Sequence, residues 1–244
     1  MRVIGSKGAG NGQFKGPDGG VAFDGEGNLV VADSENHRIQ VFRYSDGAHL
    51  RSIGSQGAGN GQFKHPQSIA FDGAGHIVVS ETGNCRVQVH RLSDGAYIRT
   101  IKGTEKIKGK KEQNKFGGGY GGVNVAFDGK GNLVLADQSN HCVQVLRYID
   151  GEHVCTIGSE GAGAGQFNYP TGVAFDAAGH IVVVEQCNHR VQVLRYSDGA
   201  HVRTIGSYGS GNGQFINPYG GIAIDSDGRI VVADSSNHRV QVLE

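Results

Sequence analysis

Apolar and polar residues alternate over short stretches of this chain. In residues 38–43 (Arg-Ile-Gln-Val-Phe-Arg) the apolar Ile39 and Val41 are separated by a polar residue, which is the period of a β-strand. Similar short stretches cover residues 20–23, 29–32 and 49–53. Turn residues such as Asp46 and Gly47 separate them and favour hairpins. The pattern predicts four short strands, and because no stretch shows a sustained helical period, the whole chain is predicted to be antiparallel β.

This four-strand unit occurs five times. The aspartate after its first strand marks the copies at spacings of 48, 56, 48 and 49 residues, at Asp24, Asp72, Asp128, Asp176 and Asp225. The copies cover residues of about 6–53, 54–101, 102–157, 158–205 and 206–244, the last together with 1–5. Units of this size are typical of β-propeller blades, which bury their apolar faces by stacking. We therefore predict a single all-β domain over residues 1–244, a β-propeller with five four-stranded antiparallel blades.

The two ends of the chain are expected to form one blade together. The sequence ends with the third strand of the fifth copy, at residues 240–243. It begins with Arg-Val-Ile-Gly at residues 2–5, which matches the fourth-strand sequence Arg-Thr-Ile-Gly at residues 203–206. We expect the N-terminal strand to complete the last blade and close the ring, which favours a monomer.

The turn between the second and third strands carries a recurring Asn-His-Arg motif. It stands at residues 36–38, 188–190 and 237–239, and the third copy keeps Asn140 and His141. These motifs, with the flanking GQF…P…GVAFD, GNLVVAD and RVQVLR segments, resemble the NHL repeat over essentially the whole chain. The chain departs from the motif at Cys85, in the place of histidine, and at Cys142, in the place of arginine.

The resemblance to NHL repeats implies a recognition module. In tripartite-motif ubiquitin ligases, NHL propellers bind RNA hairpins or protein partners. The sequence shows no RING finger, B-box or coiled-coil pattern, so we expect no ubiquitin transfer. The hypothesis is a non-catalytic binding scaffold that recognises a protein or RNA partner on one propeller face.

Composition narrows the expected surroundings of the protein. Lys+Arg and Asp+Glu both total 23, so no global field attracts nucleic acid or a membrane. No apolar stretch approaches the length that spans a bilayer. The N-terminus lacks the apolar core of a secretory signal, and the four cysteines then indicate reduced thiols. We expect a cytoplasmic protein that does not act at a membrane.

Several recurring residues have a structural and a catalytic interpretation. An acid precedes an arginine by five residues in four copies: Asp33–Arg38, Glu81–Arg86, Glu185–Arg190 and Asp234–Arg239. A pair that recurs in repeated units is typical of a structural turn staple. The glycine-rich GAGNGQF segments, such as residues 57–63, lack the Lys-Ser/Thr of a phosphate-binding P-loop. We interpret them as connectors between blades.

The histidines leave a metal site as an alternative. Residues equivalent in the repeat are His37, His141, His189 and His238, and related amidating lyases hold a metal with central propeller histidines. A catalytic zinc needs three converging ligands, whereas equivalent residues of different blades lie around a ring. We interpret Cys85, Cys142 and Cys187 as small buried or half-buried thiols in the same turn. We predict no catalytic residue, cofactor or metal, with a metal-dependent lyase or hydrolase at the central channel as the alternative.

The expansion of the third copy is the most individual segment. Residues 102–115 contain six lysines against Glu105 and Glu112: Lys102, Lys106, Lys108, Lys110, Lys111 and Lys115. Such a segment could contact phosphates, with Tyr120 available to stack a base, while a solvated loop is the structural alternative. We predict that these lysines and Tyr120 bind the partner. The near-identity of the copies also leaves open an engineered or recently amplified scaffold with no evolved ligand.

Overall fold

A computed structural model describes residues 3–17, 20–101 and 123–244 of the chain. Its regular structure consists of five consecutive antiparallel sheets, a short parallel pair and three helical turns of three residues each. The helical turns are Ser34–Asn36, Gln138–Asn140 and Ser235–Asn237. The chain divides into two compact units, Met1–Tyr120 and Gly121–Glu244, which are described separately. The predicted all-β fold is confirmed.

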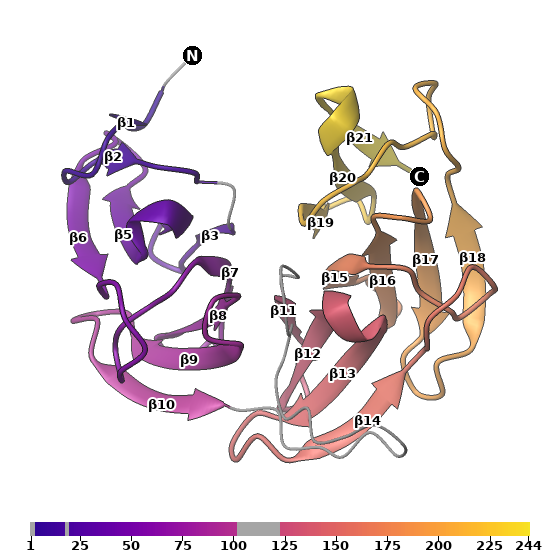
Figure 1. The fold of residues 1–244 in the computed structure, drawn as a ribbon, viewed down its shortest axis with the longest axis horizontal. Helices are drawn as coiled ribbons and strands as arrows, with labels where there is room; N and C mark the ends of the chain where they lie inside the picture. The colour runs from indigo at the N-terminus through magenta and orange to yellow at the C-terminus, as the bar shows by residue number, and fades with distance from the viewer. Residues whose placement is uncertain (1–2, 18–19, 102–122) are drawn as a thin grey trace. The chain divides into compact units, whose positions relative to one another are not determined.

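The first unit contains two four-stranded sheets, shown in indigo to magenta in Figure 1. The strands of the first sheet are β3 (Val21–Phe23), β4 (Asn28–Asp33), β5 (Arg38–Arg43) and β6 (His49–Ile53). Those of the second are β7 (Pro66–Phe71), β8 (His76–Glu81), β9 (Arg86–Arg91) and β10 (Tyr97–Ile101). Strands adjacent in sequence are adjacent in each sheet. The predicted strands at 38–43 and 49–53 are therefore confirmed to the residue.

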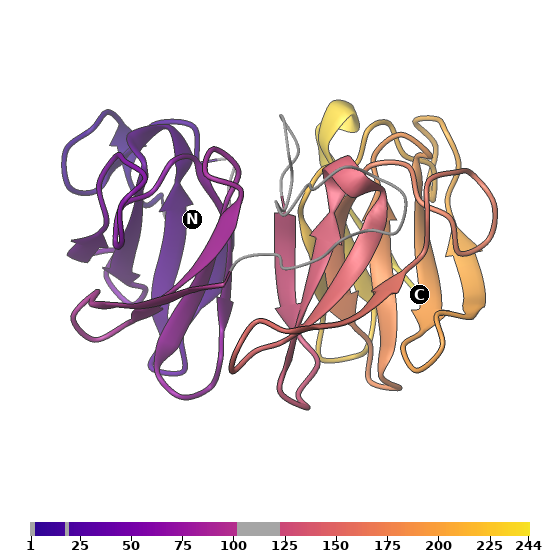
Figure 2. The ribbon, with the colours of Figure 1, turned by 60° about the horizontal axis from the view of Figure 1, so that its bottom comes forward.

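The second unit contains three sheets of the same order, visible from a second direction in Figure 2. The third sheet consists of β11 (Val123–Phe127), β12 (Asn132–Asp137), β13 (Cys142–Arg147) and β14 (His153–Ile157). The fourth consists of β15 (Pro170–Phe175), β16 (His180–Glu185), β17 (Arg190–Arg195) and β18 (His201–Ile205). The fifth consists of β19 (Ile222–Ile224), β20 (Ile230–Asp234) and β21 (Arg239–Leu243).

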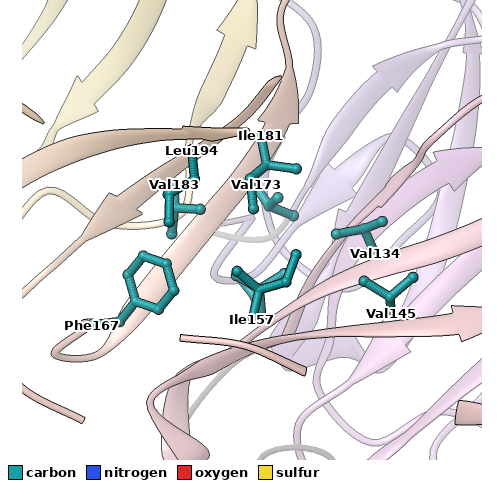
Figure 3. Packing of buried hydrophobic residues seen from close by; sticks show 10 residues of the cluster. Val134, Val145, Ile157, Phe167, Val173, Ile181, Val183 and Leu194 are labelled. Carbon is teal, nitrogen blue, oxygen red and sulfur yellow. The ribbon is translucent and has the colours of Figure 1, made fainter. Parts of the chain in front are cut away.

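Consecutive sheets within a unit bury apolar side chains between their faces. Between the third and fourth sheets, Val134 and Ile157 pack with Phe167, Val173 and Leu194 (Figure 3). Equivalent clusters join the first sheet to the second and the fourth to the fifth. Face-to-face stacking of four-stranded meanders is the packing of propeller blades. The alternating positions that predicted the strands thus supply the core.

The connectors between sheets contain a contact that the sequence did not predict. β1 (Ser6–Lys7) pairs with β2 (Gln13–Phe14) in parallel, and single parallel bridges join Gln56 to Phe63, Glu160 to Phe167 and Tyr208 to Phe215. Each bridge carries its phenylalanine into the core, where Phe167 is fully buried. Gly158 faces that ring with a φ of +79°, and a Cβ there would overlap the ring, so glycine is required. The expectation of purely antiparallel pairing is therefore wrong in the connectors.

The fifth sheet has three strands in the described part of the chain. In β21, Val240 and Val242 are 66% and 56% exposed, whereas the equivalent Val191 and Val193 of β17 are 0% and 2% exposed. Among the described residues, no strand pairs with the outer edge of β21, and its valines form an exposed apolar face. Such an edge is a template for another strand.

Ile4 lies against the first sheet at the place where the last strand of a preceding sheet would contact it. A Cβ at Gly47 would lie 3.4 Å from Ile4 Cγ1, and one at Gly199 would lie 3.1 Å from Ile157 Cγ2. Ile4 therefore contacts the first sheet in the same way as Ile157 of β14 contacts the fourth sheet. If residues 2–4 pair with β21, the chain closes into the single domain that the sequence predicts over residues 1–244. This pairing would join the two units and stays a prediction.

Candidate partner-binding face

A buried acid organises the turn between the second and third strands of a sheet. Glu185 ends β16 and is fully buried. Its carboxylate accepts hydrogen bonds from Arg190 Nε at 2.6 Å, Gln192 Nε2 at 2.7 Å and Asn188 Nδ2. It also accepts the backbone N–H of Asn168 in the connector at 2.9 Å. These four donors satisfy a charge that would otherwise be costly to bury.

The same arrangement occurs in three other sheets. Asp33, Glu81 and Asp234 accept the Nε of the arginine five residues later at 2.8, 2.6 and 2.8 Å. Burial alone would raise the pKa of Asp234, but hydrogen bonds from Ile216 N–H, Asn237 and Arg239 outweigh it and lower that pKa. The predicted acid–arginine staples are confirmed.

The arginine also fixes the connector that leads into its own sheet. Arg190 Nη1 donates to Ala162 O at 2.8 Å, and Nη2 donates to Gly163 O at 2.9 Å and Gln166 O at 3.0 Å. Asn188 Nδ2 donates to Gly161 O at 2.9 Å. The glycine-rich segment therefore serves as a connector held on the turn, as predicted. A residue with several fixed N–H donors is needed there, which explains the choice of arginine.

The recurring histidines join consecutive sheets. His37, His141 and His189 have left-handed φ angles of 56°, 53° and 52°. Each Nδ1 accepts a hydrogen bond at 3.1–3.2 Å from a backbone N–H in the segment that leads to the first strand of the next sheet. The donors are His65 for His37, Tyr169 for His141 and Asn217 for His189. In the part of the chain that the structure describes, no group of three or more His, Cys, Asp or Glu side chains could hold a metal ion.

These contacts assign a structural role to each residue of an Asn-His-Arg-x-Gln motif. The family model described as NHL repeat matches residues 19–42, 63–89, 167–194 and 220–243. The chain thus contains four NHL repeats, one in each of the first, second, fourth and fifth sheets. Each matched segment begins at the first strand of a sheet, or just before it, and ends in the third strand. It therefore contains the buried acid and the turn motif that binds it.

The third repeat, which the NHL matches leave out, keeps the sheet but changes the network. Asp137 accepts hydrogen bonds from Asn140 and Gln144. Cys142, in the place of the arginine, is buried. It is the first residue of β13 rather than a turn residue, which corrects the prediction. The repeat that lacks the arginine is also the repeat in which the lysine-rich segment replaces the glycine-rich connector in the sequence.

The thiols of this NHL chain differ in exposure. None of the four cysteines, all within the described residues, forms a disulfide. Cys85 is half-buried, as expected, with a left-handed φ of 50° in the place of the histidine. Cys187 is exposed, so the expectation of a buried or half-buried thiol is wrong there. Partial desolvation nevertheless raises the pKa of the Cys187 thiol, which lowers its thiolate fraction.

Solved structures share the fold of the NHL chain. A protein of unknown function from Bacteroides thetaiotaomicron matches 93% of this chain with a TM-score of 0.69 and 18% identity. An auxiliary nutrient binding protein from Bacteroides ovatus matches 94% of it with a TM-score of 0.64 and 16% identity. The chain covers 58% of the length of each of these proteins. No curated protein sequence matches the chain.

Ring side chains gather at the junctions between consecutive repeats. Within each unit, the sheet ends that carry the second-to-third-strand turns and the connectors are called the turn face of that unit. Ring pairs lie there with centroids 4.6, 4.6 and 5.0 Å apart: His37–His65, His141–Tyr169 and His189–Tyr208. Tyr169 and Tyr208 are 41% and 67% exposed. Rings held at fixed backbone positions offer a surface on which a partner can stack.

The turn face of the first unit also carries positive charge. Lys15 forms a 3.3 Å salt bridge with Glu35, and both side chains are more than half exposed. Burial lowers the pKa of His37, and His65, Lys64 and Lys15 lower it further while Glu35 raises it. The two lysines therefore lie near enough to His37 to act on its charge.

Sequence reasoning missed the tyrosines of this face. Tyr208 occupies a position that is Lys7, Gln56 and Glu160 in other repeats, and a search for recurring residues passes over such a position. The useful signal would have been the reverse, an aromatic residue that breaks the repeat.

The predicted contact residues Lys102, Lys106, Lys108, Lys110, Lys111, Lys115 and Tyr120 lie outside the described residues. No helix in the described residues is long and apolar enough to cross a membrane.

Proposed function

We propose that this NHL chain is a non-catalytic binding scaffold that recognises a macromolecular partner on the turn face. The observation that supports the proposal is the set of exposed rings at the repeat junctions, with Tyr208 67% exposed. Their backbone is held by buried, fully bonded acids such as Glu185, so little conformational entropy is lost when a partner binds. Function on a rigid scaffold is commonly carried by the exposed side chains of its loops.

The positive charge favours RNA over protein as the partner. Lys64 belongs to the turn face of the first unit, and the lysine-rich residues 102–115 stand in sequence where other repeats have a connector. Lysines contact phosphates, and aromatic rings stack unpaired bases. A protein partner with an acidic surface is the other class that this charge would accept. The nutrient binding protein of similar fold supports a binding role without indicating the partner class.

Charge reversal at Lys64 or in the lysine-rich segment is expected to weaken RNA binding. The first variant is Lys64→Glu and the second combines Lys108→Glu, Lys110→Glu and Lys111→Glu. Each lost phosphate contact should reduce the slope of log affinity against log salt by about 0.7 for single strands. Tyr208→Ala should remove about 1–3 kcal/mol of stacking. The measurement is fluorescence anisotropy of short single-stranded RNA oligonucleotides over a series of salt concentrations.

Lys130→Glu is the matched control, because Lys130 is an exposed lysine in the turn between β11 and β12, away from the turn face. It should leave affinity and salt slope unchanged. Equal effects of Lys64→Glu and Lys130→Glu would contradict a binding role for the turn face. If no RNA binds but an acidic protein does, with the same dependence on Lys64, the partner class is protein.

A further inference from the structure

The second sheet buries a histidine where the other sheets bury an apolar side chain. His90 in β9 is 0% exposed. The equivalent positions carry side chains that are at most 9% exposed: Phe42, Leu146, Leu194 and Leu243. The proposed binding function does not use His90, and the other four sheets form without a histidine at this position.

The surroundings of His90 leave one ring nitrogen without a partner. Its ring lies 5.0 Å from that of Phe63 and 5.9 Å from that of Tyr97. Nδ1 is 3.2 Å from Gly95 O, and since a carbonyl only accepts, Nδ1 carries the proton. Nε2 then presents a lone pair, and within the described residues no donor reaches it.

The charged groups near His90 largely compensate each other. Burial lowers the pKa of His90 below its ordinary value of 6.5, while Gly95 O and Glu81 raise it and Arg86 lowers it. Glu81 and Arg86 form a 2.6 Å salt bridge with each other. Neither charge is therefore available to stabilise an imidazolium at position 90.

We propose that His90 is an acid-sensitive switch that opens the second sheet as the pH falls. Protonation of Nε2 would place a charge, and an N–H donor without an acceptor, inside an apolar core, which is strongly unfavourable. The opened sheet exposes the ring to water, where it takes up the proton freely. Acid therefore shifts the equilibrium toward the open form.

The sign and window of the effect follow from this linkage. Above the ordinary histidine pKa of 6.5 both the folded and the open form hold a neutral ring, so the stability of the sheet does not depend on pH through His90. Below 6.5 the open form binds one proton more than the folded form. Stability is then lost progressively, until the pH reaches the lowered pKa of the folded sheet.

The test compares wild type with His90→Leu and His90→Phe, which install the side chains that other sheets use at this position. Hydrogen exchange of the β9 and β10 amides and urea unfolding are measured between about pH 7.5 and pH 5. The opening constant of wild type should rise relative to both variants by up to about tenfold per pH unit below 6.5. The pKa values of His37 and His49 are also lowered by burial, but these residues are unchanged in the variants and drop out of the comparison.

Parallel pH profiles of wild type and the variants would overturn the proposal. An NMR titration of wild type that gives the His90 imidazole a pKa at or above 6.5 would also overturn it, without relying on any variant. If His90→Leu fails to fold, His90→Phe provides the same comparison. A switch confined to the second sheet should leave amide exchange in β16 and β17 equal in wild type and variants at every pH.

Discussion

Replacement of Glu185 by alanine is expected to destabilise the second unit by about 3–5 kcal/mol, the cost of breaking a buried ion pair. The substitution leaves Arg190 Nε, Gln192 Nε2 and the Asn168 backbone N–H without the acceptor that they now share at 2.6–2.9 Å. The guanidinium is mostly buried, with 13% of its side chain exposed, so water cannot replace the carboxylate fully. Urea unfolding followed by hydrogen exchange in β16 and β17 measures the loss.

The matched control is Asp198→Ala in the same sheet. Asp198 pairs with Arg195 at 3.1 Å, but the two side chains are 51% and 59% exposed, and exposed pairs contribute little. The control should unfold almost as wild type does. If both variants lose the same stability, the buried acids are ordinary surface pairs and do not hold the turn face rigid.

Phe167→Ala is expected to cost about 3–5 kcal/mol, because it opens a cavity in a core that cannot collapse. Phe167 is fully buried between the third and fourth sheets (Figure 3). Its backbone N–H donates to Ser159 O at 2.7 Å, which fixes the connector beside it. The cavity therefore lies between two sheets whose strands are fixed by their own ladders. The free energy of unfolding in urea gives the magnitude.

Tyr208→Ala is the control for loss of a ring at an exposed position. It should change stability by less than about 0.5 kcal/mol, as surface substitutions generally do. A loss from Phe167→Ala as small as that of Tyr208→Ala would mean that the connector phenylalanine does not hold the two sheets together. A stability change in Tyr208→Ala as large as that of Phe167→Ala would also disqualify this variant as a probe of binding.

Strands in which apolar and polar residues alternate strictly were predictable from the sequence. Contacts between repeats were not. The alternation of Ile39 and Val41 fixed β5 to the residue. The bond from the Asn217 N–H to His189 joins residues 28 positions apart, and no periodic pattern indicates it. The parallel bridge at Phe167 was missed because glycine-rich segments carry no strand pattern.

The candidate site shows the same division. The acid–arginine pairs were predicted because residues five apart face each other across a tight turn, as in Glu185 and Arg190. The exposed Tyr208 was missed because it differs from its counterparts in other repeats. His90 was passed over for the same reason, since a repeat-based comparison aligns it with leucine and phenylalanine.

Closure of the propeller is tested most directly by a disulfide between the two chain ends. Gln40 of β5 lies opposite Ser52 of β6, and the equivalent residues in the last repeat and at the N-terminus are Gln241 and Val3. Strand pairing would bring their Cβ atoms to about 4.5–5.5 Å, close to disulfide geometry. A closed ring predicts that Val3→Cys combined with Gln241→Cys forms an intramolecular bond under mild oxidation, identified by peptide mass spectrometry, whereas Val3→Cys combined with Ser236→Cys does not. Absence of the first bond, or its formation only between two molecules, would contradict closure of the chain on itself.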